Sequence, residues 1–157
     1  KALCVAYYAS AEMDCFQALN WVMPVNVLDL FAEFRCATNG LQPAHGSGLL
    51  GALLHYNLPS ISGEQKDRMR DLVLARGPWD AAEQEAILDY CETDVVNTYR
   101  VWLRYELMRG ALTQGAFEQS ERSLTDFIDA RSSDRPHLAP FARASSLPDD
   151  TAGSASN

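Results

Sequence analysis

A long helical pattern begins at Asp80-Ala81-Ala82-Glu83 and runs through Tyr90-Cys91-Glu92-Thr93-Asp94 to Gly110. Its D-x-x-E opening predicts a capping box, and its length exceeds that of a typical helix, so we expect a kink or break. Within a helix, Tyr90 and Asp94 lie four residues apart on one face, so a phenol and a carboxylate point into the same cleft. A carboxylate can hold a divalent metal, and a phenol can orient the water that the metal activates. On spacing alone, the simpler interpretation is a half-buried tyrosine beside a solvated aspartate.

Shorter patterns on both sides of this segment predict strands packed against helices. Residues 2–8 and 25–31 predict strands, and the second is apolar on both faces, as is typical of a strand inside a sheet covered by helices. Helices are predicted from a cap at Ser10 through Leu19, over 49–56, from a capping box at Ser62 to Gly77-Pro78, and from a cap at Thr113 through Ile128. This order predicts an α/β or α+β domain.

The overall composition excludes several classes of protein. The chain has 157 residues, 47% apolar and 22% charged, with a net charge of −8. That charge argues against a broad basic surface for duplex DNA, whereas nucleases that use metal ions concentrate acidic side chains at their sites. Neither a secretory signal nor an apolar run of the roughly 20 residues that span a membrane is present, so we expect a cytoplasmic protein without membrane contact. Residues 145–157 are polar and predict a disordered tail.

Three separated motifs resemble the DEDD (DnaQ-like) superfamily of 3′–5′ exonucleases. They are residues 5–12, residues 27–31 and Tyr90-x-x-x-Asp94, in the order in which the superfamily has them. The resemblance implies an α/β, ribonuclease H-like fold with a mixed sheet flanked by helices, covering residues 1–144 as a partial exonuclease domain. In that superfamily four carboxylates come from three motifs: an Asp-x-Glu pair on the first strand, an Asp that opens a helix after a later strand, and an Asp four residues after a Tyr. The resemblance places this third motif at Tyr90 and Asp94. It places the second motif at Glu12, where the superfamily usually has aspartate.

The resemblance points to two different relatives along the chain. Residues 5–94 resemble exonuclease domains of phage-type family A DNA polymerases. Residues 90–142 are closer to predicted 3′–5′ exonucleases that are similar to the proofreading domain of family B polymerases. Both imply hydrolysis of the 3′-terminal phosphodiester of a nucleic acid, most simply single-stranded DNA, and make an attached DNA polymerase domain a candidate partner.

The resemblance also implies a metal site formed by acidic side chains. Two Mg²⁺ or Mn²⁺ ions about 4 Å apart would take part, with Asp94 holding one, Glu12 the other, and Tyr90 positioning the attacking water. Asp14 is a rival to Glu12 on the same short element, and Glu12 is favoured by the match of the preceding residues 7–11. Either carboxylate could instead only favour the start of a helix.

The Asp-x-Glu pair that the superfamily carries on its first strand is absent before Glu12. We therefore expect an N-terminally truncated domain that is inactive as it stands. A catalytically silent module that binds nucleic acid or docks on a polymerase is the main alternative, and a helical interaction protein is a third.

Several other polar residues have weaker assignments. Lys66, Arg68 and Arg70 are candidates for contact with the phosphate backbone, although a charged helix face is usually just solvated. Asp29 is expected to order the end of its strand. Tyr99 and Trp102 have the spacing of core residues.

Overall fold

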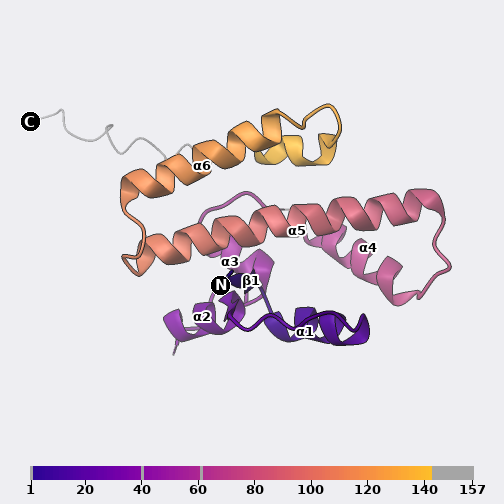
Figure 1. Ribbon diagram of the computed structural model, residues 1–157, viewed down its shortest axis with the longest axis horizontal. Helices are drawn as coiled ribbons and strands as arrows, with labels where there is room; N and C mark the ends of the chain where they lie inside the picture. The colour runs from indigo at the N-terminus through magenta and orange to yellow at the C-terminus, as the bar shows by residue number, and fades with distance from the viewer. Residues whose placement is uncertain (1, 40, 61, 143–157) are drawn as a thin grey trace, which may run out of the picture.

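The structure is a computed structural model and describes residues 2–39, 41–60 and 62–142. Along the chain the elements are β1 (Cys4–Ala6), α1 (Ala9–Ala18), β2 (Val27–Asp29), α2 (Leu30–Ala37), α3 (Leu49–His55), α4 (Gly63–Leu74), α5 (Ala81–Met108), α6 (Gln114–Asp129) and the 3₁₀ helix η1 (Pro136–Phe141). Helix α5 crosses the molecule, with α6 on one side and the strands with α1 and α2 on the other (Figure 1). The tail predicted for residues 145–157 lies outside the described residues.

The two strands are parallel neighbours in one small sheet. Cys4 pairs with Val27 and Ala6 with Asp29. Parallel neighbours need a long crossover connection, which α1 supplies between them. The described residues thus form an α/β arrangement with a small parallel sheet, compatible with a ribonuclease H-like fold. The mixed sheet predicted from the resemblance is not found among them, since both of their strands run the same way.

The predicted strand over 25–31 is too long, because Asp29 ends it and starts α2. Its Oδ1 accepts hydrogen bonds from the backbone N of Phe31 at 3.0 Å and of Tyr8 at 3.1 Å. This confirms that Asp29 orders the strand end. The predicted burial of both faces is wrong in this part of the chain, since Val25 is 76% exposed and Val27 39%.

Helix α1 begins at Ala9, so the predicted cap at Ser10 is also wrong. The residue before the helix is Tyr8, whose φ of 75° lies in the left-handed region. A tyrosine is strained there, and the hydrogen bond from its N–H to Asp29 helps to hold that conformation.

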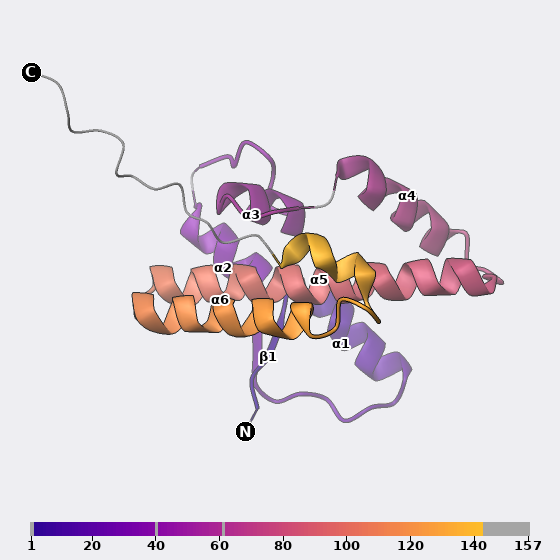
Figure 2. The same cartoon turned by 90° about the horizontal axis from the view of Figure 1, so that it is seen from above.

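The capping predictions for the later helices are confirmed. Ser62 and Gln65 form the capping box of α4, Asp80 and Glu83 that of α5, and the Thr113 hydroxyl caps α6. Helix α5 is continuous over 28 residues, so the expected break is absent. Long helices depend on tertiary packing, and α5 contacts α6, η1, α3, α4 and β1. Figure 2 shows α3 and α4 on one side of α5 and β1 on the other.

Two groups of buried side chains hold α5 in place. Leu30, Phe34, Leu53 and Val101 belong to a cluster that joins α2, α3 and α5, and Trp102 packs against it. A second cluster lies between α6, η1 and α5 and consists of Val96, Ile128, Leu138 and Phe141. No helix in the described ranges combines the length and apolar content that a membrane crossing requires.

Candidate active site on helix α5

A pocket of about 270 Å³ lies where α5 faces the end of β1 and the start of α3. Tyr7, Tyr8 and Phe31 line it with aromatic rings, and leucines of α3 add apolar surface. The polar lining consists of Lys66 from α4 and Tyr90, Asp94 and Asn97 from α5. A mostly apolar pocket with a few convergent polar groups is typical of a small-molecule or substrate site, and this volume is close to the lower end of that class, about 300 Å³.

The structure brings Tyr90 and Asp94 together as their spacing predicts. Burial, together with the charge of Asp94 and a hydrogen-bonding interaction with it, raises the pKa of Tyr90 to about 12. The phenol therefore stays protonated at neutral pH and acts as a hydrogen-bond donor. Burial also raises the pKa of Asp94, while the interaction with Tyr90 opposes that rise.

Two charged groups from other elements reach Asp94. After burial and Tyr90, the ammonium group of Lys66 lowers the pKa of Asp94 and the carboxylate of Glu12 raises it. Glu12 is exposed in the first turn of α1. Asp14 follows two residues later, which places it on a different side of α1. Of these two rivals, Glu12 is therefore the one that the described residues bring close to Asp94.

The basic candidates on α4 occupy different places. Lys66 is half-buried and lines the pocket. Arg70 is exposed and forms ion pairs with its own neighbours, Asp67 at 3.5 Å and Asp71 at 3.6 Å. Arg68 is exposed on the same helix. Only Lys66 of these three lines the pocket.

The two acidic residues of the site offer ligands for one divalent cation rather than for a pair of ions. Within residues 2–39, 41–60 and 62–142, no three His, Cys, Asp or Glu side chains are arranged to hold a metal ion. Asp94 and Glu12 supply hard carboxylate oxygens, and Mg²⁺ commonly binds one or two carboxylates and completes its shell with water and substrate phosphate. The two residues therefore fit one such ion.

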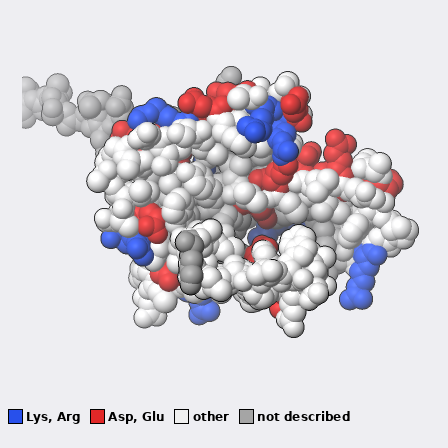
Figure 3. Space-filling view, viewed as in Figure 1, with Lys and Arg blue, Asp and Glu red and all other residues white. Residues whose placement is uncertain are grey.

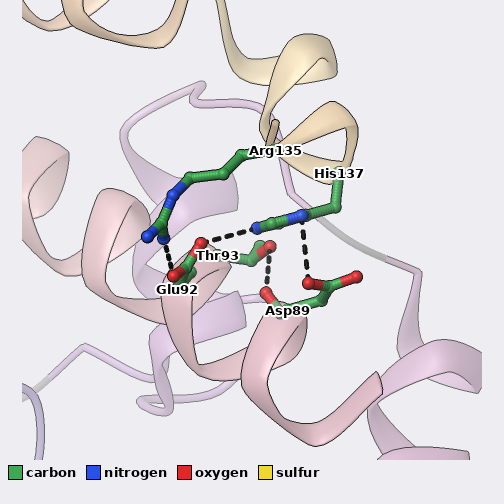
Figure 4. A network of polar contacts seen from close by, with 5 residues as sticks. All are labelled: Asp89, Glu92, Thr93, Arg135 and His137. Atoms are coloured by element: carbon green, nitrogen blue, oxygen red, sulfur yellow. Dashed lines mark hydrogen bonds and ion pairs between the residues drawn. The ribbon is translucent and has the colours of Figure 1, made fainter. Parts of the chain in front are cut away.

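The opposite side of α5 is fixed by a separate polar network (Figure 4). The ring of His137 lies between two carboxylates, with Nδ1 3.1 Å from Asp89 and Nε2 2.9 Å from Glu92. Glu92 also forms an ion pair with Arg135. These contacts attach η1 and the residue before it to α5 at the level of Tyr90, on a different face of the helix.

The charges on the molecular surface agree with the acidic composition. On the face seen in Figure 3, acidic side chains gather toward one end, and Lys and Arg occur in small separate groups. That face offers no broad basic area for duplex DNA.

Comparison with known proteins supports the exonuclease interpretation for the second half of the chain. Residues 73–145 match the family model described as predicted 3′–5′ exonuclease related to the exonuclease domain of PolB. The match supports a DnaQ-like exonuclease family, whose members are exonuclease-like hydrolases of nucleic acid and generally depend on a divalent metal. Neither the curated proteins nor the solved structures contain a match to the chain. The resemblance of residues 5–94 to family A polymerases stays a prediction.

The sequence did not point to two features of the pocket. The aromatic group Tyr7, Tyr8 and Phe31 comes from the ends of both predicted strands, and only the fold brings these rings together. Asn97 lies seven residues after Tyr90. The signal in the sequence that could have identified it is therefore a polar residue at helical spacing from Tyr90.

Proposed function

We propose that this chain forms part of a metal-dependent 3′–5′ exonuclease that hydrolyses the 3′-terminal phosphodiester of single-stranded DNA. The observation that carries the proposal is the convergence of Tyr90, Asp94 and Lys66 in one pocket, with Glu12 close enough to affect Asp94. The family match over residues 73–145, which includes all of α5, supports it.

Each side chain has a role that follows from its chemistry. Asp94 and Glu12 would hold Mg²⁺ or Mn²⁺, and a bound divalent cation supplies charge stabilisation to a phosphoryl oxygen and lowers the pKa of a water. The Tyr90 hydroxyl, protonated at neutral pH, donates its proton in a hydrogen bond to Asp94, and its oxygen would orient the attacking water by accepting a hydrogen bond from it. The ammonium group of Lys66 faces the phosphate of the substrate. The extra methylene of Glu12 relative to aspartate loosens its position, which lowers the rate.

A second ion requires carboxylates beyond the two that the site holds. The resemblance assigns them to an Asp-x-Glu strand, and this chain has no such pair before Glu12. We therefore expect the 157-residue chain by itself to bind a cation and DNA, and to cut only when that strand is supplied. A polymerase domain attached to it would be the natural source of single-stranded 3′ ends.

A catalytically silent module for nucleic-acid binding or polymerase docking is the second candidate. It is favoured by glutamate in the second motif and by the lack of a third carboxylate near Asp94 in the described residues. Both candidates share the pocket and differ in whether phosphodiester bonds break.

The test is a degradation assay on a 5′-labelled single-stranded oligonucleotide with Mg²⁺, using the chain extended at its N-terminus by a strand that carries Asp-x-Glu. We expect stepwise shortening of the oligonucleotide from its 3′ end. Asp94→Ala should lower the rate of shortening more than about 100-fold, which exceeds the typical effect of mutating a residue that only hydrogen-bonds a metal ligand. Asp126→Ala, on α6 and away from the pocket, is the matched control.

Cation binding separates the roles of the two carboxylates on α1. Glu12→Gln should weaken Mn²⁺ binding, measured by paramagnetic broadening in NMR spectra, while Asp14→Asn should leave it unchanged. Binding of DNA without any shortening by the extended chain would support the silent module instead.

A further inference from the structure

Asn97 brings to the pocket a polar side chain that neither candidate mechanism uses. It is 1% exposed and lines the pocket beside Asp94. Neither Nδ2 nor Oδ1 of its amide has a hydrogen-bond partner among the described residues. An amide buried in this way costs folding free energy, so its presence calls for a compensating role.

The position of Asn97 on α5 points to the pocket as the place of that role. Tyr90, Asp94 and Asn97 are spaced i, i+4 and i+7, so they share one face of the helix. The next residue on this face is Val101, which is 1% exposed in the cluster that contains Leu53. Asn97 therefore stands at the inner end of a polar row, where the pocket meets the core.

The chemistry of the lining defines the kind of ligand that would satisfy Asn97. An amide offers two donors and one acceptor, which match the edge of a nucleobase or a sugar hydroxyl. Tyr8 and Phe31, with ring centres 5.3 Å apart, offer aromatic surface for a base. Lys66, on a different helix, offers the cation for a phosphate.

We propose that Asn97 is a substrate-positioning residue, which hydrogen-bonds the base or sugar of the terminal nucleotide while Lys66 takes its phosphate. This inference rests on the proposed function, since it assigns a residue to the same pocket. It adds a second point of attachment, so that the nucleotide is held at both ends with its phosphate next to Asp94.

The test is a binding titration of the 157-residue chain that does not depend on cleavage. The probes are dAMP, dCMP, dGMP and dTMP, with inorganic phosphate as the comparison, followed by ¹H–¹⁵N NMR. We expect at least one nucleotide to bind the wild type and to bind Asn97→Leu about tenfold less tightly, as the loss of one or two hydrogen bonds predicts. Phosphate binding should stay the same in Asn97→Leu and weaken in Lys66→Met.

Thermal unfolding of the same variants distinguishes positioning from a structural role. Leucine has a similar shape without the unpaired amide, so Asn97→Leu should raise the unfolding midpoint while it weakens nucleotide binding. Gln119→Leu, which removes an exposed amide from α6, should change neither quantity. A lower midpoint together with weaker binding would assign Asn97 to the fold and overturn the proposal.

The result also separates this inference from the proposed function. Equal nucleotide affinity in wild type and Asn97→Leu, or no nucleotide binding by the wild type, overturns the role of Asn97. The exonuclease proposal is decided independently by the effect of Asp94→Ala on degradation.

Discussion

Across one turn of α5, Asp94 raises the pKa of Tyr90, whereas Tyr90 lowers the pKa of Asp94. The carboxylate of Asp94 adds to the burial that raises the pKa of Tyr90 to about 12. The hydrogen-bonding interaction with Tyr90 stabilises the ionised form of Asp94, against the burial that raises its pKa. The result is a protonated phenol beside a carboxylate that is costly to ionise, and both properties have measurable consequences.

Asp94→Asn should stabilise the metal-free protein at neutral pH. Because burial raises the pKa of Asp94 in the folded state, the folded state favours the protonated acid and is weakened once pH rises through that pKa. The neutral asparagine avoids this cost. The difference in free energy of unfolding between the variant and the wild type should therefore be largest near pH 7 and shrink as pH falls below the usual range of an aspartate.

The measurement is urea unfolding at several pH values with EDTA present. In a second series with Mg²⁺ in place of EDTA, the ion should raise the midpoint of the wild type and leave that of Asp94→Asn nearly unchanged, because the ion stabilises only the ionised carboxylate. Asp126→Asn on α6 is the control. A stability difference that stays constant from pH 3 to pH 7 would contradict the argument.

Tyr90→Phe should lower the rate of 3′ cleavage by the extended chain about 100-fold, the lower end of the effect of a group that assists proton transfer. Phenylalanine keeps the ring and removes the hydroxyl, so DNA affinity should change little. Because the pKa of Tyr90 is raised to about 12, its phenol stays protonated between pH 8 and pH 10. Over that range the wild-type rate should therefore fall no more than the rate of the variant. A steeper fall for the wild type would mean that the phenol ionises at lower pH and acts in another way.

Glu92→Gln should loosen η1 from α5 and cost about 1–2 kcal/mol of stability, between the values for an exposed ion pair and for a hydrogen bond to a charged group. Glu92 receives both the guanidinium of Arg135 and Nε2 of His137. Amide hydrogen exchange should therefore increase over 136–141 before it increases in α3. Glu85→Gln, exposed on the same helix, is the control, and an equal loss in both variants would count against the role of Glu92.

Gly51→Ala should destabilise the wall of the pocket that α3 provides. A Cβ at Gly51 would stand 2.1 Å from the carbonyl oxygen of Gly46, so the loop before α3 has to move. We expect a loss of about 1–3 kcal/mol, as for other overpacked sites. Gly115→Ala, in open space on α6, should instead gain up to about 1 kcal/mol. If Gly51→Ala and Gly115→Ala changed the midpoint of thermal unfolding by similar amounts, the loop before α3 would be able to move without a cost in stability.

The parts of the fold that could be predicted are those that depend on neighbours in the sequence. The capping boxes at Ser62 and Asp80 involve residues three positions apart, and both are present. The shared face of Tyr90 and Asp94 follows from helical spacing in the same way. The end of β2 could not be predicted, because Leu30 and Phe31 are apolar in either a strand or a helix, and the difference comes from Asp29.

The rest of the site depends on contacts between distant segments, for which a single sequence carries no local signal. His137 meets Glu92 across 45 residues, and Tyr7 meets the loop before α3 through a hydrogen bond to the carbonyl oxygen of Ser47 at 2.6 Å. The same limitation applies to Asn97, since its burial becomes visible only when β1, α3 and α4 are placed against α5.

Arg100→Leu should be among the most damaging single changes to the fold. The guanidinium is fully buried, its Nε lies 3.7 Å from Oε2 of Glu121, and it donates a hydrogen bond to the carbonyl oxygen of Phe141. Removing one partner of a buried pair costs about 3–5 kcal/mol, because the other charge stays in a medium that solvates it poorly. The double variant with Glu121→Leu should recover part of this loss in a double-mutant cycle measured by urea unfolding. A double variant as unstable as the sum of the two single ones would show that the two groups act independently, each through its own contacts, and that the pairing of α5 with α6 does not depend on their charges.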